Sequence, residues 1–385
     1  MMEWNAQLKD IMPQVIELRR DIHRHPELGG EEIRTHELVV AWLEKLGMEV
    51  STFEDCYGVM GVLRNGEGRC VAIRADMDAL PVQEEADVPF ASEIPGRMHA
   101  CGHDAHVAIA MGSAMWLCSH KDQWQGTVRF LFEPAEETFG GGRLMVEQGC
   151  MEGVDAVIGQ HMNPRYEPGA FFAKPGFVSG SSDKIILSVR GQSCHGAYPE
   201  SGTDAIVIAA QVISALQSLV SRSISPFDPA VLTLGTIQGG TANNIICGEV
   251  HCTGTLRTLS NDTRQKLCRK IREVACGVAS AMGGEAEVTI EPGYSAVYND
   301  DRYYAVIEKQ AALLLGDEKI IRREAPSLGV ESFCYFVQNT PGVYYDIGSG
   351  VGTALHTPTF CVDESCLEYG VALQCSSVLE LLKEE

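Results

Sequence analysis

The hydrophobic and polar positions at the start of the chain predict helices. In residues 8–28, LKDIMPQVIELRRDIHRHPEL, apolar side chains recur every three to four positions, which is the spacing of a single buried helix face. Residues 31–47, EEIRTHELVVAWLEKLG, show the same spacing and end at Gly47, a typical C-terminal stop. We therefore expect two helices in this part of the chain.

Short apolar runs typical of buried strands come next. They are GVMGVLR (58–64), CVAIRAD (70–76), TVRFLFEP (127–134), DAVIGQH (155–161) and, much later, GVYYDIG (342–348). Helical or turn signals separate these runs. This alternation predicts an α/β fold around a mainly parallel sheet.

Residues 180–293 have a different pattern. Their order is strand, helix, two strands, helix, strand, which is typical of a small α+β domain with an open sheet. Turn signals flank the segment on both sides, KPGFVSGSS before it and EPGYSAVYND after it. We therefore predict a catalytic domain in two parts, 1–179 and 294–385, with a smaller domain, 180–293, inserted between them.

Composition narrows the class of protein. A chain of 385 residues with 45% hydrophobic and 21% charged residues is ordinary for a globular protein of more than one domain. The formal net charge of -22 disfavours nucleic acid and anionic membrane surfaces as partners. The N-terminal residues lack the pattern of a signal peptide, and no uninterrupted apolar run reaches the ~18–20 residues of a membrane span. With 14 scattered cysteines, we expect reduced thiols and a cytoplasmic protein.

Polar residues gather where the predicted strands end, and ligands of open α/β sheets bind at that edge. RADMDALP brings Asp76 and Asp78, and ACGHDAH opens a predicted helix. The other clusters are EPAEE with Glu133, Glu136 and Glu137, GQH with His161, and ALHTPTF with His356.

These clusters offer thiolate, imidazole and carboxylate ligands, namely Cys101, His103, Glu137, His161 and His356. Five ligands are too many for one tetrahedrally coordinated ion and a reasonable number for two ions that share a site. A zinc finger is disfavoured, because a second cysteine pair at the usual spacing is missing. In the pair Glu136 and Glu137, one side chain can bind metal while the other faces the attacking water. Asp78 could orient a ligand histidine, and His99 and His106 are expected to be structural, outer-shell or helix-surface residues.

The joint occurrence of several motifs, in order along the chain, identifies a family. They are DIHRHPELGGEE, RADMDALPVQEE, MHACGHDAH, FEPAEE, GQHM, HGAYPESGTDAI, GGTANNII, GTLRT and ALHTPTF. The chain resembles, over essentially its whole length, the amidohydrolase branch of the aminoacylase and carboxypeptidase metallopeptidases. That branch includes hippurate hydrolase, N-acetyldiaminopimelate deacetylase and plant auxin-conjugate hydrolases.

The resemblance implies a role for each matching position. The five ligand candidates would bind two divalent metal ions, Zn²⁺ or Mn²⁺, with Co²⁺ or Ni²⁺ also compatible. Glu136 would be the general base and acid, and Asp78 would steady the metal site. Asp76 stands where other branches have a metal-binding histidine, so the resemblance does not define its role.

The resemblance also implies that the inserted domain is a lid that often forms the contact of a homodimer or higher oligomer. His195 would stabilise the oxyanion, in its own or the neighbouring subunit's site. Asn244 and Arg257 would hold the substrate's carboxylate, for which a planar guanidinium is well suited.

The chain departs from the family pattern in three places. Ser193 and Cys194 precede the lid histidine where relatives have Gly-small-Gly before it. Ser332 replaces an aspartate that many relatives carry, and Cys361 stands where asparagine or aspartate is common. Each departure could alter substrate choice or lid movement, but none removes a ligand or the base.

Four functions fit the sequence to different degrees. The leading hypothesis is metal-dependent hydrolysis of N-acyl amino acids. A dipeptidase or carboxypeptidase would use the same machinery on a small peptide substrate. A silent binding protein should lack a ligand or Glu136, and both are present. A redox role for Cys101 predicts a thiol that alkylates readily in the presence of metal.

Overall fold

The chain consists of two compact units in the computed structural model, which describes residues 1–350 and 352–383. Unit 1 comprises residues 1–178, 298–325 and 332–385. Unit 2 comprises residues 179–297 and 326–331. The short segment 326–331 packs with unit 2, an arrangement that the sequence pattern does not predict.

The N-terminal helices differ from the prediction at their start. The helix expected over residues 8–28 is the shorter α2 (Met12–Arg24), an additional helix α1 (Met2–Leu8) precedes it, and the second expected helix is α3 (Ile33–Lys45). Pro13 lies in the first turn of α2. Because proline lacks an amide hydrogen and its ring clashes with the preceding turn, a helix that enters from the N-terminal side ends before it.

Unit 1 is built on a mixed sheet with the strand order β1-β2-β4-β3-β5-β14-β6-β13. The strands are β1 (Glu49–Thr52), β2 (Val59–Asn65), β3 (Cys70–Asp76), β4 (Gly126–Glu133), β5 (Ala156–Asn163), β6 (Phe171–Ala173), β13 (Ile320–Arg322) and β14 (Gly342–Gly348). The central strands β4, β3, β5 and β14 are parallel, whereas β2 pairs with β4 and β6 pairs with β14 in the antiparallel sense. The predicted α/β fold with a mainly parallel sheet is confirmed.

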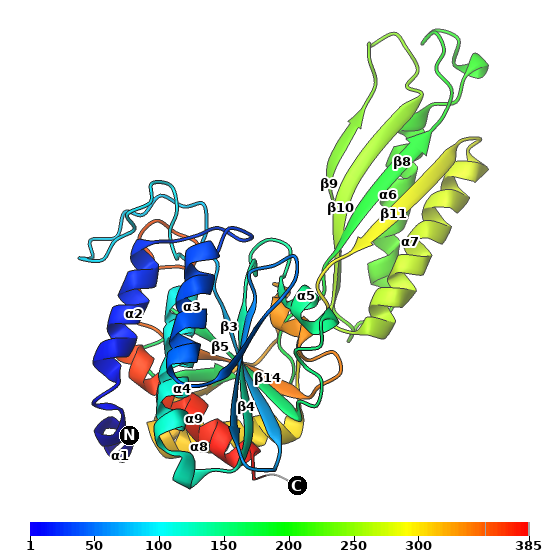
Figure 1. Ribbon diagram of the computed structural model, residues 1–385. Helices are drawn as coiled ribbons and strands as arrows, with labels where there is room; N and C mark the ends of the chain where they lie inside the picture. The colour runs from blue at the N-terminus through cyan, green and yellow to red at the C-terminus, as the bar shows by residue number, and fades with distance from the viewer. Residues whose placement is uncertain (351, 384–385) are drawn as a thin grey trace. The chain divides into compact units, whose positions relative to one another are not determined.

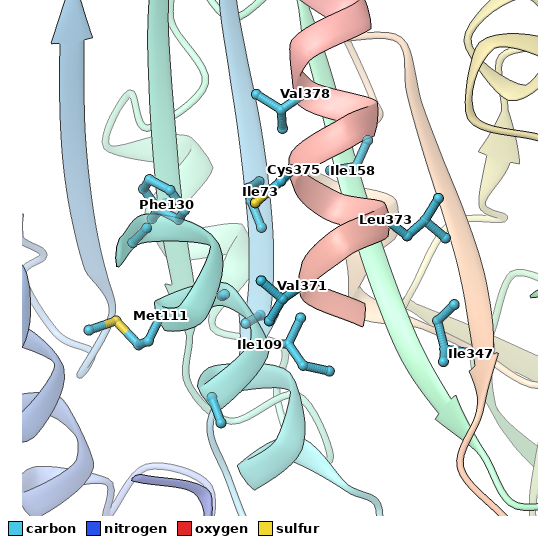
Figure 2. Close-up of a cluster of buried hydrophobic side chains, with 14 of the residues drawn as sticks. Ile73, Ile109, Met111, Phe130, Ile158, Ile347, Val371, Leu373, Cys375 and Val378 are labelled. Atoms are coloured by element: carbon cyan, nitrogen blue, oxygen red, sulfur yellow. The ribbon is translucent and has the colours of Figure 1, made fainter. Parts of the chain in front are cut away.

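Helices α4 (His103–Ser119) and α9 (Ser365–Leu381) pack against each other and against the central strands. All side chains of α4 from His103 to Leu117 are buried, as expected for a helix that is apolar on every side. Figure 2 shows the core between these helices and the sheet, where Ile73, Phe130 and Ile158 of the strands lie near Val371 and Val378 of α9. The remaining elements of unit 1 are α5 (Gly142–Glu147), β7 (Gly176–Phe177), β12 (Tyr298–Asn299), α8 (Asp301–Leu315) and the 3₁₀ turns η1 (Lys121–Gln123), η3 (Asp317–Lys319) and η4 (Ser332–Tyr335).

Unit 2 contains an antiparallel sheet with the order β11-β8-β10-β9, and two helices that cover one face of it (Figure 1). Its elements are β8 (Asp183–Arg190), α6 (Ala205–Arg222), β9 (Ala230–Gly239), β10 (Glu249–Thr258), α7 (Asn261–Ala281) and β11 (Glu285–Pro292). They occur in the order that the sequence predicts, and Leu216, Ile271 and their neighbours form a separate core.

Helix α6 is, among the described residues, the one helix long and apolar enough to cross a membrane by length and composition, with a mean hydropathy of 1.5. One third of it is buried, on the side that packs against the sheet of unit 2. A core helix passes the same test, so α6 is weak evidence for a membrane span.

Candidate metal centre and active site

The carboxyl ends of the parallel strands bring the candidate ligands together. Asp76 ends β3 and Glu133 ends β4, so Asp78 and the EPAEE turn follow directly at the same edge of the sheet. His161 lies near the end of β5, and His356 lies in the segment that follows β14. Cys101 comes just before α4, and His103 is the first residue of that helix.

The donor atoms of these residues lie close to one another. The Cys101 Sγ atom is 3.4 Å from Nε2 of His161 and 3.4 Å from Nε2 of His356. The Glu137 Oε1 atom is 3.1 Å from His356 Nε2 and 4.0 Å from His103 Nε2. Four overlapping groups each hold their donor atoms within 4.8 Å: Cys101 with His103 and His161, Cys101 with Glu137 and His356, His103 with Glu136 and Glu137, and His103 with Asp76 and His106.

The donor set around Glu137 suits a divalent cation. The Glu137 Oε1 atom is buried and lies 3.1 Å from Nε2 of His356. Burial opposes ionisation of Glu137, but the hydrogen bond and charge of His356 and the charge of His103 lower its pKa to about 2. Thiolate, imidazole and carboxylate around such an oxygen form a donor set suited to zinc and related divalent ions.

Two of the candidate ligand histidines, His103 and His161, are oriented by their second ring nitrogens. His103 Nδ1 donates to the backbone oxygen of Asp78 at 2.9 Å, and His161 Nδ1 donates to the backbone oxygen of Met162 at 2.8 Å. Because Nδ1 carries the hydrogen in each ring, the lone pair of Nε2 is available toward the centre.

The Asp78 side chain fixes the turn that bears the two glutamates. Its Oδ1 accepts the backbone N–H of Glu136 and its Oδ2 accepts that of Glu137, both at 3.0 Å. Asp78 is 1% exposed. One buried carboxylate therefore positions the backbone of Glu136 and Glu137, and the backbone oxygen of the same residue orients His103.

The EPAEE turn is also fixed from behind by Glu32. Ala135 has a φ of 57°, a left-handed conformation that is uncommon for a residue other than glycine. Glu32 Oε1 accepts the Ala135 N–H at 2.6 Å and Oε2 accepts the Gly30 N–H at 2.8 Å. Burial raises the pKa of Glu32 to about 7. Its two hydrogen bonds connect the turn to the segment before α3.

Asp76 belongs to a buried network beside the ligand cluster. It accepts from Nδ1 of His106 at 2.5 Å and from Nη1 of Arg74 at 2.5 Å. His106 Nε2 in turn accepts the backbone N–H of Met162 at 2.9 Å. His106 is therefore neutral with the hydrogen on Nδ1, and it links β3 to β5.

The expectation for His99 and His106 is met in part. Both are buried, so neither is a helix-surface residue. Neither ring nitrogen of His99 has a hydrogen-bond partner among the described residues, and burial lowers the pKa of His99 to about 3. His99 is thus a neutral packed ring next to the ligand segment.

Arg74 is a site residue that the sequence analysis does not identify. Its side chain is fully buried and binds three partners: Glu133 Oε2 at 2.5 Å, Asp76 at 2.5 Å and Ser332 Oγ at 2.7 Å. Burial raises the pKa of Asp76, but the charges of Arg74 and the neighbouring histidines hold it well below its usual range. The available signal was an arginine inside the otherwise apolar run CVAIRAD, because a buried charge requires paired acids.

The three predicted substrate-binding residues lie in unit 2. His195 and Asn244 occupy adjacent loops, joined by the bridge between His195 and Ile245 and by the Gly196 N–H to the Asn244 backbone oxygen at 2.7 Å. His195 is exposed, and its Nδ1 accepts the Ala197 N–H at 3.1 Å. Arg257 lies on β10, and its Nη1 is buried with no hydrogen-bond partner in the part of the chain that the structure describes.

Comparison with known proteins gives the class of the chain. The family model described as peptidase family M20/M25/M40 matches residues 72–380. N-acetylcysteine deacetylase of Bacillus subtilis is 37% identical over 92% of this chain and 93% of its own length. Thermostable carboxypeptidase 2 of Saccharolobus solfataricus is 38% identical over 94% of both chains. The crystal structure of a Bacillus subtilis protein described as a dinuclear metal binding peptidase from the M20 family has a TM-score of 0.86 at 33% identity, covering 98% of this chain and 99% of the other.

The chain belongs to peptidase family M20/M25/M40, and it is a hydrolase of that family. This result confirms the resemblance found in the motifs. Because the relatives include both a deacetylase and a carboxypeptidase, family membership leaves two substrate classes.

Proposed function

We propose that the protein hydrolyses the amide bond of N-acyl amino acids, releasing a carboxylate and a free amino acid, as hippurate hydrolase does. The observation that carries this proposal is the cluster of thiol, imidazole and carboxylate donors with Glu136 beside it. The similarity to N-acetylcysteine deacetylase supports an acyl amino acid as the substrate.

Two divalent metal ions, Zn²⁺ or Mn²⁺, are the proposed cofactors, with Co²⁺ or Ni²⁺ as alternatives. The residues that would hold them are Cys101, His103, Glu137, His161 and His356. When bound, such ions supply Lewis acidity toward the scissile carbonyl and lower the pKa of water. Burial raises the pKa of the Cys101 thiol well above its usual value, so this side chain must lose a proton to become a ligand.

Glu136 is the proposed general base and acid. A carboxylate oxygen of Glu136 lies within 4.8 Å of donor atoms of His103 and Glu137, next to the place where the attacking water must be. Glu136 takes the proton of that water during attack and returns it to the nitrogen of the leaving amine. The carboxyl therefore begins and ends the reaction ionised.

Unit 2 is the proposed lid, and it supplies the residues that recognise the substrate. Arg257 and Asn244 bind the free carboxylate of the amino acid, and His195 stabilises the oxyanion. The buried Nη1 of Arg257 without a hydrogen-bond partner supports this role, because a desolvated guanidinium gains most from a carboxylate that it binds with two parallel hydrogen bonds.

A homodimer, or a higher oligomer, formed through unit 2 is the proposed assembly. Strand β9 is at the edge of its sheet, and an unpaired edge strand can pair with another chain. Ile237 on this strand and Ile206 and Val207 on α6 are exposed. The net charge of -22 supports small molecules as partners, rather than nucleic acid or an anionic membrane surface. The proposed location is the cytoplasm, which the 14 scattered cysteines support.

A dipeptidase or carboxypeptidase is the second candidate, supported by the similarity to thermostable carboxypeptidase 2. It would use the same ligands and the same base, and only the group on the acyl side would differ. The discriminating property is therefore the preference between acyl and aminoacyl substrates.

The first experiment is a substrate panel with defined metal content. The panel contains N-acetylcysteine, other N-acetyl amino acids, N-benzoylglycine and dipeptides, and release of amino acid is measured for metal-stripped chain reloaded with Zn²⁺ or Mn²⁺. We expect cleavage only after reloading, with acyl amino acids preferred. A preference for dipeptides would support the second candidate, and cleavage of nothing in the panel would favour a binding protein.

We expect Arg257→Gln to raise KM for N-acyl amino acids about 10- to 100-fold, since hydrogen bonds to charged groups contribute roughly 1.5–3 kcal/mol. The kcat value should change much less. The measurement compares each acyl amino acid with its carboxamide analogue, which lacks the carboxylate, and Arg190→Gln on the exposed face of β8 is the control. An equal loss for both substrates would contradict carboxylate binding by Arg257.

A further inference from the structure

The side chain of Glu136 is held by a residue that lies far away in the sequence. The backbone N–H of Ser332 donates to Oε1 of Glu136 at 3.2 Å. The backbone of Glu136 is itself held by Asp78. Asp78 thus fixes the backbone of Glu136, and Ser332 contributes to the orientation of its carboxylate.

Ser332 is fixed in turn by its own side chain. It is 0% exposed, and its Oγ accepts from Nη2 of Arg74 at 2.7 Å. The carboxylates of Asp76 and Glu133 hold this guanidinium at the end of the central strands. The hydroxyl of Ser332 is therefore tied to the most deeply buried charge network of the site.

The next residue provides a second anchor. Phe333 is 0% exposed, and its ring lies against Gly159 of β5, where an added Cβ would come within 2.8 Å of it. Its ring centroid is 5.2 Å from that of Tyr344. Phe333 thus holds one side of the turn that presents the N–H against the core, and the hydrogen bond from Arg74 holds Ser332 beside it.

A general base must present a defined oxygen to the proton that it takes, and misplacement by ~1 Å costs on the order of 10²-fold in rate. The bond to Oε1 restrains the rotation of the Glu136 carboxylate next to His103 and Glu137. A loss of this restraint would affect proton transfer more than substrate affinity.

We propose that Ser332 is a positioning residue for the hydrolytic reaction: its hydroxyl, bound by Arg74, holds its backbone N–H against Oε1 of Glu136. This proposal rests on the proposed role of Glu136 as general base. The position deserves a test because the hydroxyl, unlike the backbone N–H, can be removed by substitution.

The test uses Ser332→Thr and Ser332→Val, an isosteric pair in which only threonine keeps the hydroxyl, together with Ser332→Ala. We expect Ser332→Ala and Ser332→Val to lower kcat about 10- to 100-fold, with KM and bound metal per chain within about twofold of wild type. Ser332→Thr should retain at least about tenfold more activity than Ser332→Val. The matched control is Ser113→Ala, which removes a buried hydroxyl that donates to Gln374 in α9.

The variants separate the positioning role of Ser332 from the proposed role of Glu136. Equal kcat values for the threonine and valine variants would overturn the proposal, and so would a loss of bound metal in parallel with activity. Glu136→Gln is assayed alongside: if it stays active, the proposed general base is wrong whatever the Ser332 variants do. If Glu136→Gln is inactive and Ser332→Ala has wild-type kcat, only the positioning role fails.

Discussion

Glu136→Gln is expected to lower kcat by about 10³-fold, within the range that general acid–base catalysis contributes. Glutamine has nearly the same shape as glutamate, and its amide can neither take the proton of the attacking water nor return it to the leaving amine. The backbone contact to Asp78 remains, so the turn should keep its conformation. Rates are measured under saturating substrate with the preferred member of the substrate panel.

Two further measurements distinguish the loss of the general base from a loss of metal or a general effect of substitution. Bound metal per chain should be unchanged, because the proposed ligand is the neighbouring Glu137. Glu147→Gln, on the exposed side of α5, is the control and should have wild-type kcat. If the Glu136 variant kept more than about a tenth of the activity, another group would have to move the proton.

Arg74→Met is expected to lower the free energy of unfolding of unit 1 by about 3–5 kcal/mol. Methionine fills much of the volume of the arginine stem but leaves Asp76 and Glu133 buried without their shared cation. Removal of one partner from a buried ion pair is costly for this reason. The lower free energy of unfolding should be measurable without substrate, because the network of Arg74, Asp76 and Glu133 connects strands of the sheet as well as residues of the site.

Tryptophan fluorescence during urea unfolding measures this effect in the right unit. All four tryptophans lie in unit 1, at positions 4, 42, 116 and 124. The control is Arg129→Met on β4, whose Nη1 donates to the Cys150 backbone oxygen at 2.7 Å and which should cost only about 1–2 kcal/mol. If both variants lost the same free energy of unfolding, the unpaired carboxylates of Asp76 and Glu133 would not contribute to the effect of Arg74→Met.

The central architecture could be predicted because it depends on long, regular patterns. The apolar runs of the parallel strands and the alternating strands of unit 2 are visible in the sequence. Strands β1, β6 and β13 are too short to produce such a pattern. The apolar spacing predicts a helix from residue 8 and does not reveal that this helix starts at Met12, where Pro13 occupies its first turn. It also does not predict the separate helix α1 before it.

The candidate ligands could be located because parallel strands end at one edge, so residues after different strands converge there. The supporting contacts could not be located in this way. Glu32 holds Ala135, and Arg74 holds Ser332, across separations of more than a hundred residues. Contacts between single residues leave no periodic pattern in the sequence. The one available signal is the charged Arg74 inside an apolar strand, which indicates that the arginine has buried acidic partners.

The candidate ligands differ in how freely they can move. His103 begins α4, a helix buried on all sides, so its ring cannot swing away unless unit 1 unfolds. His356 has a side chain that is 52% exposed and lies at a left-handed φ of 62° in a segment outside the helices and strands. If the five candidates bind ions, His356 is therefore the candidate that can move most easily, and the residence time of the ions would depend on the segment around it rather than on global stability. Two related enzymes with the same five ligands could for this reason differ widely in how fast a chelator inactivates them.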